Sequence, residues 1–120
     1  MIIASRNPGK VREIKAICYD WPVEWVTDEE VSWPDVEETG SSYLENALLK
    51  ARTVVEATGE AALADDSGIE VDALGGGPGP RSARYAGEGA SDEENLRALL
   101  RALAGVPGPG RTARYRAVAA

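Results

Sequence analysis

The sequence predicts a mixed α/β (α+β) domain, in which one sheet combines parallel and antiparallel strands. Short apolar runs typical of strands alternate with three segments of helical periodicity, as in α/β and α+β proteins. The chain has 120 residues, close to the usual size of one domain. We therefore expect residues 1–120 to form a single domain with four or five strands and three helices.

The composition narrows the classes of function. The formal net charge of −7 argues against nucleic acid as a partner, although local cations or a metal would still allow a small phosphorylated ligand. The lack of His excludes imidazole catalysis and His-ligated metal, and the single Cys18 excludes an internal disulfide. No apolar run approaches the ~18 residues of a membrane span, and the first residues do not resemble a signal peptide. We expect a cytoplasmic protein that binds neither nucleic acid nor membrane.

The first part of the chain has the pattern of a strand, a turn and a helix. Met1–Ala4 is predicted to be a buried strand, Ser5–Lys10 a turn-rich loop and Val11–Tyr19 an amphipathic helix. The predicted inward side chains of this helix are Val11, Ile14, Ile17 and Cys18. This order places backbone N–H groups at a helix N-terminus, where anions bind, and Lys10 adds a positive charge. An ordinary strand-to-helix connection explains the same pattern and is the better interpretation of this segment alone.

The clearest predicted helix follows an acidic, irregular segment. Pro22–Val26 is a candidate second strand, and Thr27–Gly40 is irregular. Ser42 and Glu45 then form a capping box, and the helix that it opens ends at Gly59. The predicted buried stripe of this helix consists of Leu44, Ala47, Leu48, Ala51, Val54 and Val55.

An acidic pair separates two β-prone runs in the middle of the chain. The runs Ala61–Ala64 and Ile69–Val71 flank Asp65-Asp66-Ser67-Gly68. This arrangement predicts a strand, a tight turn and a second strand, as a hairpin or a bent pair. Adjacent carboxylates repel each other, so the pair requires a compensating cation or hydrogen bonds.

The last part of the chain predicts a loop, a helix and a strand. Asp72–Pro80 is too rich in Gly and Pro for regular structure and is expected to be a shaped surface loop. Ser91 and Glu94 form a second capping box, and the helix ends at Gly105. Its predicted inward side chains are Leu96, Leu99, Leu100 and Leu103. Thr112–Ala120 is the last predicted strand.

The polar residues fall into two candidate groups. Donors suited to phosphate are Ser5, Asn7, Lys10 and Lys50, and carboxylates suited to a hard divalent cation are Glu37, Glu38, Asp65 and Asp66. Together they suggest chemistry on a phosphoanhydride or phosphoester. Simpler interpretations exist, because the segment around Glu37 fits a solvated acidic loop. Asn46 and Lys50, four residues apart, fit a solvent-facing pair on their helix.

Four motifs, in this order, resemble the inosine triphosphate pyrophosphatase family. They are Ser5-x-Asn7-Pro8-Gly9-Lys10-x-x-Glu13, Glu37-Glu38-Thr39-Gly40-Ser41-Ser42-Tyr43-x-Glu45-Asn46-Ala47-x-x-Lys50-Ala51, Ala64-Asp65-Asp66-Ser67-Gly68-Ile69-x-Val71-x-Ala73-Leu74-Gly75-Gly76 and Pro78-Gly79-x-x-Ser82-Ala83-Arg84-Tyr85-Ala86-Gly87. The motifs cover almost the whole chain and are highly specific in combination. The resemblance implies a pyrophosphatase that hydrolyses ITP, dITP and XTP to the monophosphate and pyrophosphate, which sanitises the nucleotide pool.

The resemblance also implies roles for individual residues. Mg²⁺ would be the cofactor, with Glu37 or Glu38 and Asp66 as its ligands; Asp66 would accept a proton from the attacking water, and Asp65 would be a supporting acid. The implied substrate contacts are Ser5, Arg6, Asn7, Pro8, Gly9, Lys10, Lys50 and Ser67. The implied fold is the elongated ITPase-like domain, with a long central mixed sheet, two lobes and a nucleotide cleft between them. Homodimers are usual in the family.

The chain departs from the family pattern in two respects. Family chains are considerably longer, so we expect residues 1–120 to correspond to the N-terminal portion of the family fold, as a fragment, as a chain completed by a partner or as a degraded gene product. Arg6 stands where small residues are common. One alternative is an inactive homologue that binds nucleotide or associates with a full-length partner. The other is a pyrophosphatase of the septum-inhibition type, which the residues of Ala64–Gly68 do not support.

Overall fold

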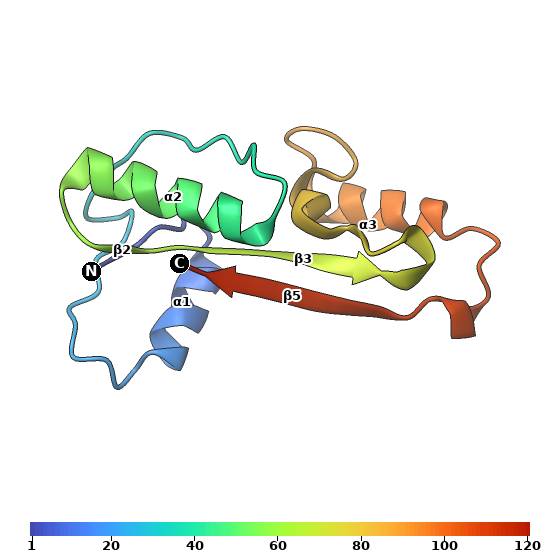
Figure 1. Ribbon diagram of the computed structural model, residues 1–120, viewed down its shortest axis with the longest axis horizontal. Coiled ribbons are helices and arrows are strands. Elements are labelled where there is room, and N and C mark those ends of the chain that lie inside the picture. The colour runs from blue at the N-terminus through green and yellow to red at the C-terminus, as the bar shows by residue number, and fades with distance from the viewer. The chain divides into compact units, whose positions relative to one another are not determined.

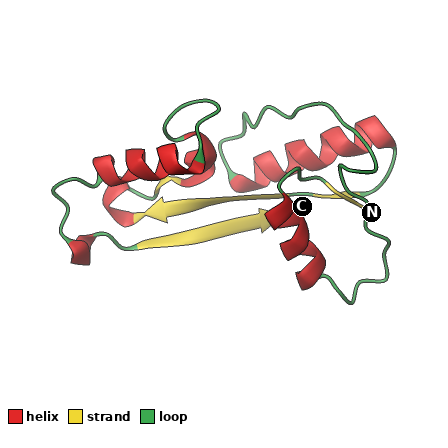
Figure 2. Ribbon diagram, turned by 180° about the vertical axis from the view of Figure 1, so that it is seen from behind, coloured by secondary structure: helices red, strands yellow, loops and turns green.

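A computed structural model describes residues 1–120 and confirms the mixed α/β class (Figures 1 and 2). The chain divides into two compact units, the first formed by Met1–Asp66 with Val118–Ala120 and the second by Ser67–Ala117. The strands and α-helices are β1 (Ile2–Ile3), α1 (Pro8–Ile17), α2 (Tyr43–Thr58), β2 (Ala62–Leu63), β3 (Asp65–Val71), β4 (Gly77–Pro78), α3 (Asp92–Ala102) and β5 (Ala113–Ala119). No helix is long and apolar enough to span a membrane.

The first unit is built on the parallel pair β1 and β2, in which Ile2 lies opposite Ala62. Figures 1 and 2 show α1 and α2 on opposite sides of this pair. The core consists of Ile2, Ala4, Trp33, Ala51, Val54 and Ala64. The predicted strand Pro22–Val26 is reduced to one parallel bridge between Val26 and Ile2. Pro22 has no N–H to donate to a ladder, which agrees with pairing only at the end of this segment.

Helix α1 begins earlier than predicted, because Asn7 caps it. The Asn7 side chain accepts hydrogen bonds from the backbone of Gly9 and Lys10, and Pro8 takes the first helical position, where it needs no N–H partner. The second half of the predicted loop Ser5–Lys10 is therefore helix. The predicted inward face is only partly correct, because α1 has no buried residue and Ile17 is 70% exposed.

Helix α2 has the predicted caps but a different buried face. Ser42 is the N-cap and Gly59 the left-handed C-cap. The buried residues are Tyr43, Asn46, Ala47, Ala51 and Val54, whereas Leu44 and Val55, predicted inside, are exposed. Apolar residues occupy more than one side of this helix, so periodicity alone did not choose between the sides. The side that packs carries two alanines, whose small side chains permit close approach to the strands.

The predicted turn at Asp65-Asp66-Ser67-Gly68 is wrong, because these residues lie in the continuous strand β3. Gly68 is required there for close packing and not for a turn. A Cβ on Gly68 would lie 2.0 Å from the Gly79 carbonyl oxygen and 2.7 Å from the Ser82 hydroxyl. The same hydroxyl accepts from the Ile69 N–H at 2.9 Å and donates to the Gly79 oxygen at 2.6 Å. Glycine within a strand often marks such a backbone approach.

The second unit contains most of a three-stranded sheet in the order β4-β3-β5. Helix α3 supplies Leu99, and its C-cap supplies Leu103, to a core around Val71. Leu96 and Leu100, predicted inside, are about half exposed, and the helix ends before the predicted Gly105. The segment Asp72–Pro80 is more regular than predicted, since it contains β4, which pairs antiparallel with β3. The predicted last strand is confirmed as β5, which lies at an edge of the sheet.

Candidate active site

The first strand-to-helix turn arranges three of the predicted phosphate ligands. The Ser5 hydroxyl oxygen accepts from the Asn7 N–H at 3.2 Å, and Asn7 Oδ1 accepts from the N–H groups of Gly9 at 2.9 Å and Lys10 at 3.4 Å. These bonds fix the path of the turn before the helix begins. Lys10 stands in the first turn of α1, where the helix dipole disfavours a cation. A lysine at this position needs another source of stabilisation.

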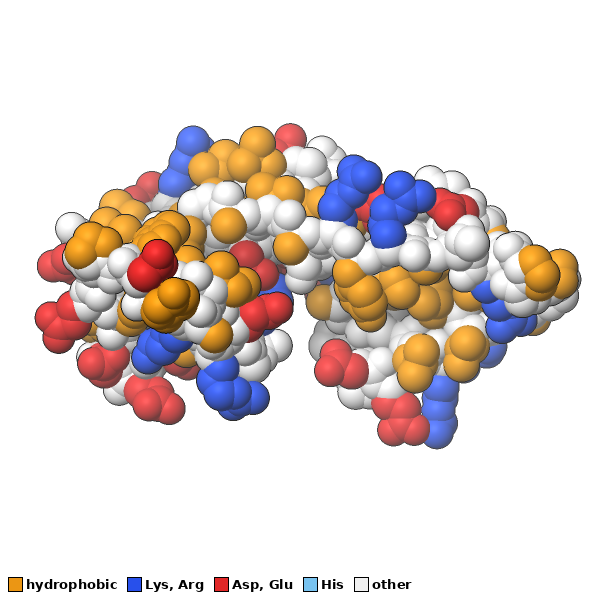
Figure 3. Space-filling model, turned by 90° about the horizontal axis from the view of Figure 1, so that it is seen from below, with side chains coloured by type: hydrophobic (Ala, Val, Ile, Leu, Met, Phe, Trp, Pro, Cys, Tyr) orange, Lys and Arg blue, Asp and Glu red, His pale blue; other side chains and the backbone are white.

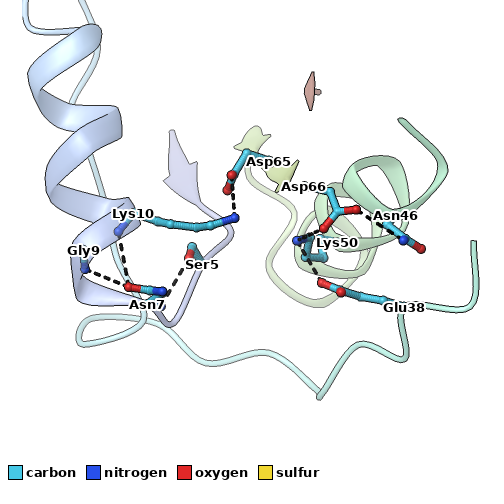
Figure 4. Close-up of polar contacts among 9 residues, drawn as sticks. All are labelled: Ser5, Asn7, Gly9, Lys10, Glu38, Asn46, Lys50, Asp65 and Asp66. Carbon is cyan, nitrogen blue, oxygen red and sulfur yellow. Dashed lines mark hydrogen bonds and ion pairs between the residues drawn. The ribbon is translucent and has the colours of Figure 1, made fainter. Parts of the chain in front are cut away.

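Asp65 provides that stabilisation. Its carboxylate lies 2.7 Å from the Lys10 ammonium, and both side chains are largely buried, at 18% and 28% exposure. This pair joins β3 to α1 within the first unit (Figure 4).

Asp66 meets a second lysine, because successive side chains of a strand point to opposite faces. The Lys50 ammonium lies 3.5 Å from Asp66 Oδ1 and 2.9 Å from Glu38 Oε1, so it bridges two carboxylates (Figure 4). Asn46 Nδ2 donates to Asp66 Oδ2 at 3.3 Å, and Asn46 Oδ1 accepts from the Gly40 N–H at 2.8 Å. Asn46 is completely buried, so the interpretation of Asn46 and Lys50 as a solvent-facing pair is wrong.

The surroundings of Asp66 make its ionisation less favourable than that of a free carboxyl. Burial raises the pKa of the Asp66 carboxyl above its usual value, and the nearby Glu38 carboxylate acts in the same direction. Lys50 and the Asn46 amide oppose this effect by stabilising the charged form. A raised pKa suits a carboxylate that accepts a proton during catalysis.

A cavity of about 260 Å³ lies beside these groups in the first unit. Its lining residues are Ala4, Ser5, Arg6, Asn7, Lys10, Trp33, Val36, Glu38 and Lys50. The polar donors and both lysines therefore face one space, and its size is below the ~300–1,000 Å³ of sites that enclose a whole drug-sized ligand. A group of phosphates fits the space better than a whole nucleotide does.

Not every predicted site residue joins this cluster. Glu37 is exposed, whereas its neighbour Glu38 contacts Lys50. No group of three or more acidic or Cys side chains converges as a metal cluster, so the predicted set of four carboxylates is not brought together. Ser67 is the first residue of the second unit, and its predicted substrate contact stays a prediction.

The sequence did not predict two residues that line the cavity, Trp33 and Val36, or the contacts of Arg6. Trp33 and Val36 line the cavity from an irregular segment that has no periodic signal. The Arg6 guanidinium donates to the Asp35 carboxylate and to the Trp33 carbonyl, and it lies 5.6 Å from the centroid of the Trp33 ring. Asn46 could have been found, because it lies three residues after the buried Tyr43 and therefore on the same side of α2.

A sequence model of the Ham1 family matches residues 1–120. The chain belongs to the Ham1 family. The resemblance to the pyrophosphatase motifs is confirmed by relatives of this family with the name dITP/XTP pyrophosphatase. The relative from Vibrio vulnificus (strain YJ016) is 51% identical over 118 residues, which make up 98% of this chain and 59% of the relative. The relative from Yersinia pestis is 50% identical and is covered to 60%.

Solved Ham1 structures show the same similarity in three dimensions. A HAM1 protein from Coxiella burnetii superposes with a TM-score of 0.85 at 41% identity, over 98% of this chain and 60% of that protein. The Ham1 protein of Staphylococcus aureus superposes with a TM-score of 0.79 at 44% identity, again over 98% and 60%. This Ham1 chain thus spans about three fifths of the length of the relatives that it matches.

Proposed function

We propose that this Ham1 chain hydrolyses ITP, dITP and XTP to the nucleoside monophosphate and pyrophosphate. The observation that carries the proposal is the convergence of two lysines and their partner carboxylates beside one cavity. Lys10 and Lys50 both line this cavity, and each is paired with one of the adjacent aspartates of β3. The relatives' name, dITP/XTP pyrophosphatase, supports this substrate class.

The phosphate-binding part of the site is the turn before α1. We assign the triphosphate to the hydroxyl of Ser5, the side-chain amide of Asn7 and the ammonium of Lys10. Pro8 and Gly9 would shape the turn around it, because Pro8 has no N–H and the Gly9 N–H donates to Asn7 Oδ1. The positive end of the helix dipole favours an anion at this place, and a lysine adds a point charge. Lys50 faces the same cavity from α2 and would bind phosphate oxygens from the other side.

We propose Mg²⁺ as the cofactor, held by the carboxylates of Glu38 and Asp66 together with phosphate oxygens. The donor set fits such an ion, because it consists of carboxylate oxygens and both carboxylates already bind one cation, the Lys50 ammonium. A site with two carboxylates, completed by substrate phosphates, is a common arrangement for Mg²⁺. When bound, the ion would screen phosphate charge and lower the pKa of a nearby water.

The carboxylate of Asp66 is the proposed general base. It would take a proton from the attacking water as the water oxygen bonds to phosphorus and the bridging bond between the α- and β-phosphates breaks. Asn46 holds this carboxylate through Oδ2, which fixes its orientation. Asp65 would act as a positioning residue for Lys10.

Pyrophosphate release by the 120-residue chain tests the proposal. dITP, dGTP and ATP are compared with and without Mg²⁺, and circular dichroism shows that the sample is folded. Release that requires Mg²⁺ and favours dITP is the expected result. Folded protein that releases no pyrophosphate would contradict catalysis by this chain, and binding of dITP without turnover would then identify it as an inactive homologue that retains the nucleotide site.

A further inference from the structure

The two lysines assigned to phosphate are both held by carboxylates. Lys10 contacts Asp65, and Lys50 lies between Glu38 and Asp66. The lysines therefore neutralise the acids that surround the site, and they cannot bind phosphate with the same hydrogens at the same time. We propose that Lys50 is an exchangeable internal counterion: a divalent cation displaces its ammonium from Glu38 and Asp66, which frees Lys50 for the phosphates.

The Lys50 ammonium and a divalent cation cannot both lie between the two carboxylates. The Lys50 side chain is 17% exposed and the Asp66 side chain 7%, so the ammonium fills a space that is largely closed to solvent. A cation held by the same two carboxylates needs that space. Two positive charges there would repel each other strongly, because the surroundings screen them less than bulk water does. One of the two must leave.

The structure offers the displaced lysine a destination. Lys50 already lines the cavity that Asn7 and Lys10 also face. The ammonium of a lysine stands on a flexible four-carbon stem, so it can turn into the cavity while α2 stays in place. There it would add a second lysine to the phosphate-binding group.

The carboxylate that remains is held without Lys50. Asn46 donates to Asp66 Oδ2, and the Gly40 N–H donates to Asn46 Oδ1. The segment that carries Glu38 is therefore also fixed, through Gly40, to α2. This frame keeps both carboxylates in position when the ammonium leaves.

Coupling of the two ligands follows from the exchange. Cation binding releases Lys50 for phosphate, and phosphate draws Lys50 away from the carboxylates, so each ligand raises the affinity for the other by the same factor. This inference rests on the proposed metal and phosphate roles, but it predicts a binding property that needs no turnover. Without nucleotide, Lys50 should compete with the cation and keep its affinity low.

The test is titration calorimetry of Mn²⁺ and Mg²⁺ against the 120-residue chain without nucleotide. Lys50→Met removes the competing ammonium and should tighten cation binding on the order of tenfold. Lys10→Met is the matched control, because it removes the same charge from the same cavity but from a lysine that contacts Asp65. It should change cation affinity much less. Lys50→Gln repeats the test if the Met variant is unstable.

A second titration measures the coupling itself, with a dITP analogue whose bridging oxygen between the α- and β-phosphates is replaced by a methylene group. In the wild type, the cation should strengthen analogue binding by about the factor that Lys50→Met gains for the cation alone. In Lys50→Met this enhancement should shrink.

Other results overturn the inference. The inference is wrong if the cation affinity of Lys50→Met equals or falls below that of the wild type. It is also wrong if Lys10→Met gains as much cation affinity as Lys50→Met, or if no variant binds the cation. Pyrophosphate release by the wild type is measured in parallel. A gain in Lys50→Met without release supports the exchange and contradicts the proposed hydrolysis, so the two failures are distinguishable.

Discussion

At the scale of single residues, the adjacent aspartates Asp65 and Asp66 have separate roles because they belong to a strand. Each carboxylate faces a different helix and meets a different lysine. Repulsion between the neighbours is thereby compensated twice, by Lys10 from α1 and by Lys50 from α2.

Asp66→Asn should lower turnover on the order of 10²–10⁴-fold, the usual contribution of a general base. The melting temperature should stay equal to that of the wild type or rise, because burial raises the pKa of this carboxyl and the fold therefore disfavours its charged form. Differential scanning fluorimetry and pyrophosphate release measure the two effects. Asp28→Asn, at an exposed position of the same unit, is the control. A large drop in melting temperature for Asp66→Asn would make Asp66 a structural residue.

Gly68→Ala should destabilise the protein by about 1–3 kcal/mol, the usual effect of overpacking. The added methyl group would meet the Gly79 carbonyl oxygen, which is backbone and cannot rotate away. Urea denaturation measures the free energy of unfolding. Gly108→Ala is the matched control in the same unit, since nothing lies within 4 Å of its added Cβ. Equal stability of the two variants would contradict the close approach of β3 to Gly79.

At the scale of elements, the start of α2 matters because this helix carries Asn46 and Lys50. Ser42 accepts from the Glu45 N–H at 3.1 Å, while the Glu45 carboxylate accepts from the N–H of Ser41 at 2.7 Å. The capping box predicted from the sequence is present. The Glu45 carboxylate accepts from the N–H of Ser41, the residue before the N-cap, whereas in the usual capping box it accepts from the N-cap itself.

This cap should make stability depend on pH. The hydrogen bonds from Ser41 hold the pKa of the Glu45 carboxyl below its usual value. A lowered pKa in the folded state stabilises the protein at neutral pH, and this contribution disappears as the pH falls through the folded-state pKa. The melting temperature of Glu45→Gln should therefore be below that of the wild type at pH 7, and the difference should shrink in acid.

Thermal unfolding between pH 7 and pH 3 provides the measurement for the Glu45 cap. Glu56→Gln removes the same charge from an exposed position of α2 away from the cap, and serves as the control. A difference between wild type and Glu45→Gln that is constant or grows toward low pH would contradict the role of the carboxylate.

At the scale of the whole molecule, large apolar side chains remain exposed. Ile17 and Tyr19 are 70% and 82% exposed in the first unit, and Tyr115 on β5 is 82% exposed in the second. Figure 3 shows hydrophobic side chains between charged ones on one face. β5 also has one neighbour only, so its other edge presents unpaired backbone groups.

We expect the purified chain to associate as its concentration rises, as a homodimer or larger species, because exposed apolar area and an open strand edge both favour it. Size-exclusion chromatography with light scattering measures the mass. Tyr115→Ser should reduce the associated fraction with little change in the free energy of unfolding, since this side chain is exposed. A monodisperse monomer at all concentrations would count against the prediction.

The sequence by itself determined the order of the three α-helices, both caps of α2, the N-cap of α3 and the residue types of the site. These features depend on local chemistry: Ser42 and Ser91 cap whatever helix follows them, and Gly59 ends one. The family motifs also singled out Lys10, Lys50 and the acidic pair before any packing was known.

Only the tertiary structure decided which side of each helix is buried and which groups meet. The choice of Asn46 and Ala47 over Leu44 depends on what packs against α2, which no local pattern contains. Position 68 requires glycine because the Gly79 carbonyl oxygen packs against it, which the local sequence does not reveal. The tertiary structure also decided that Glu38, and not Glu37, is the partner of Lys50, because such a contact exists only once the chain has folded.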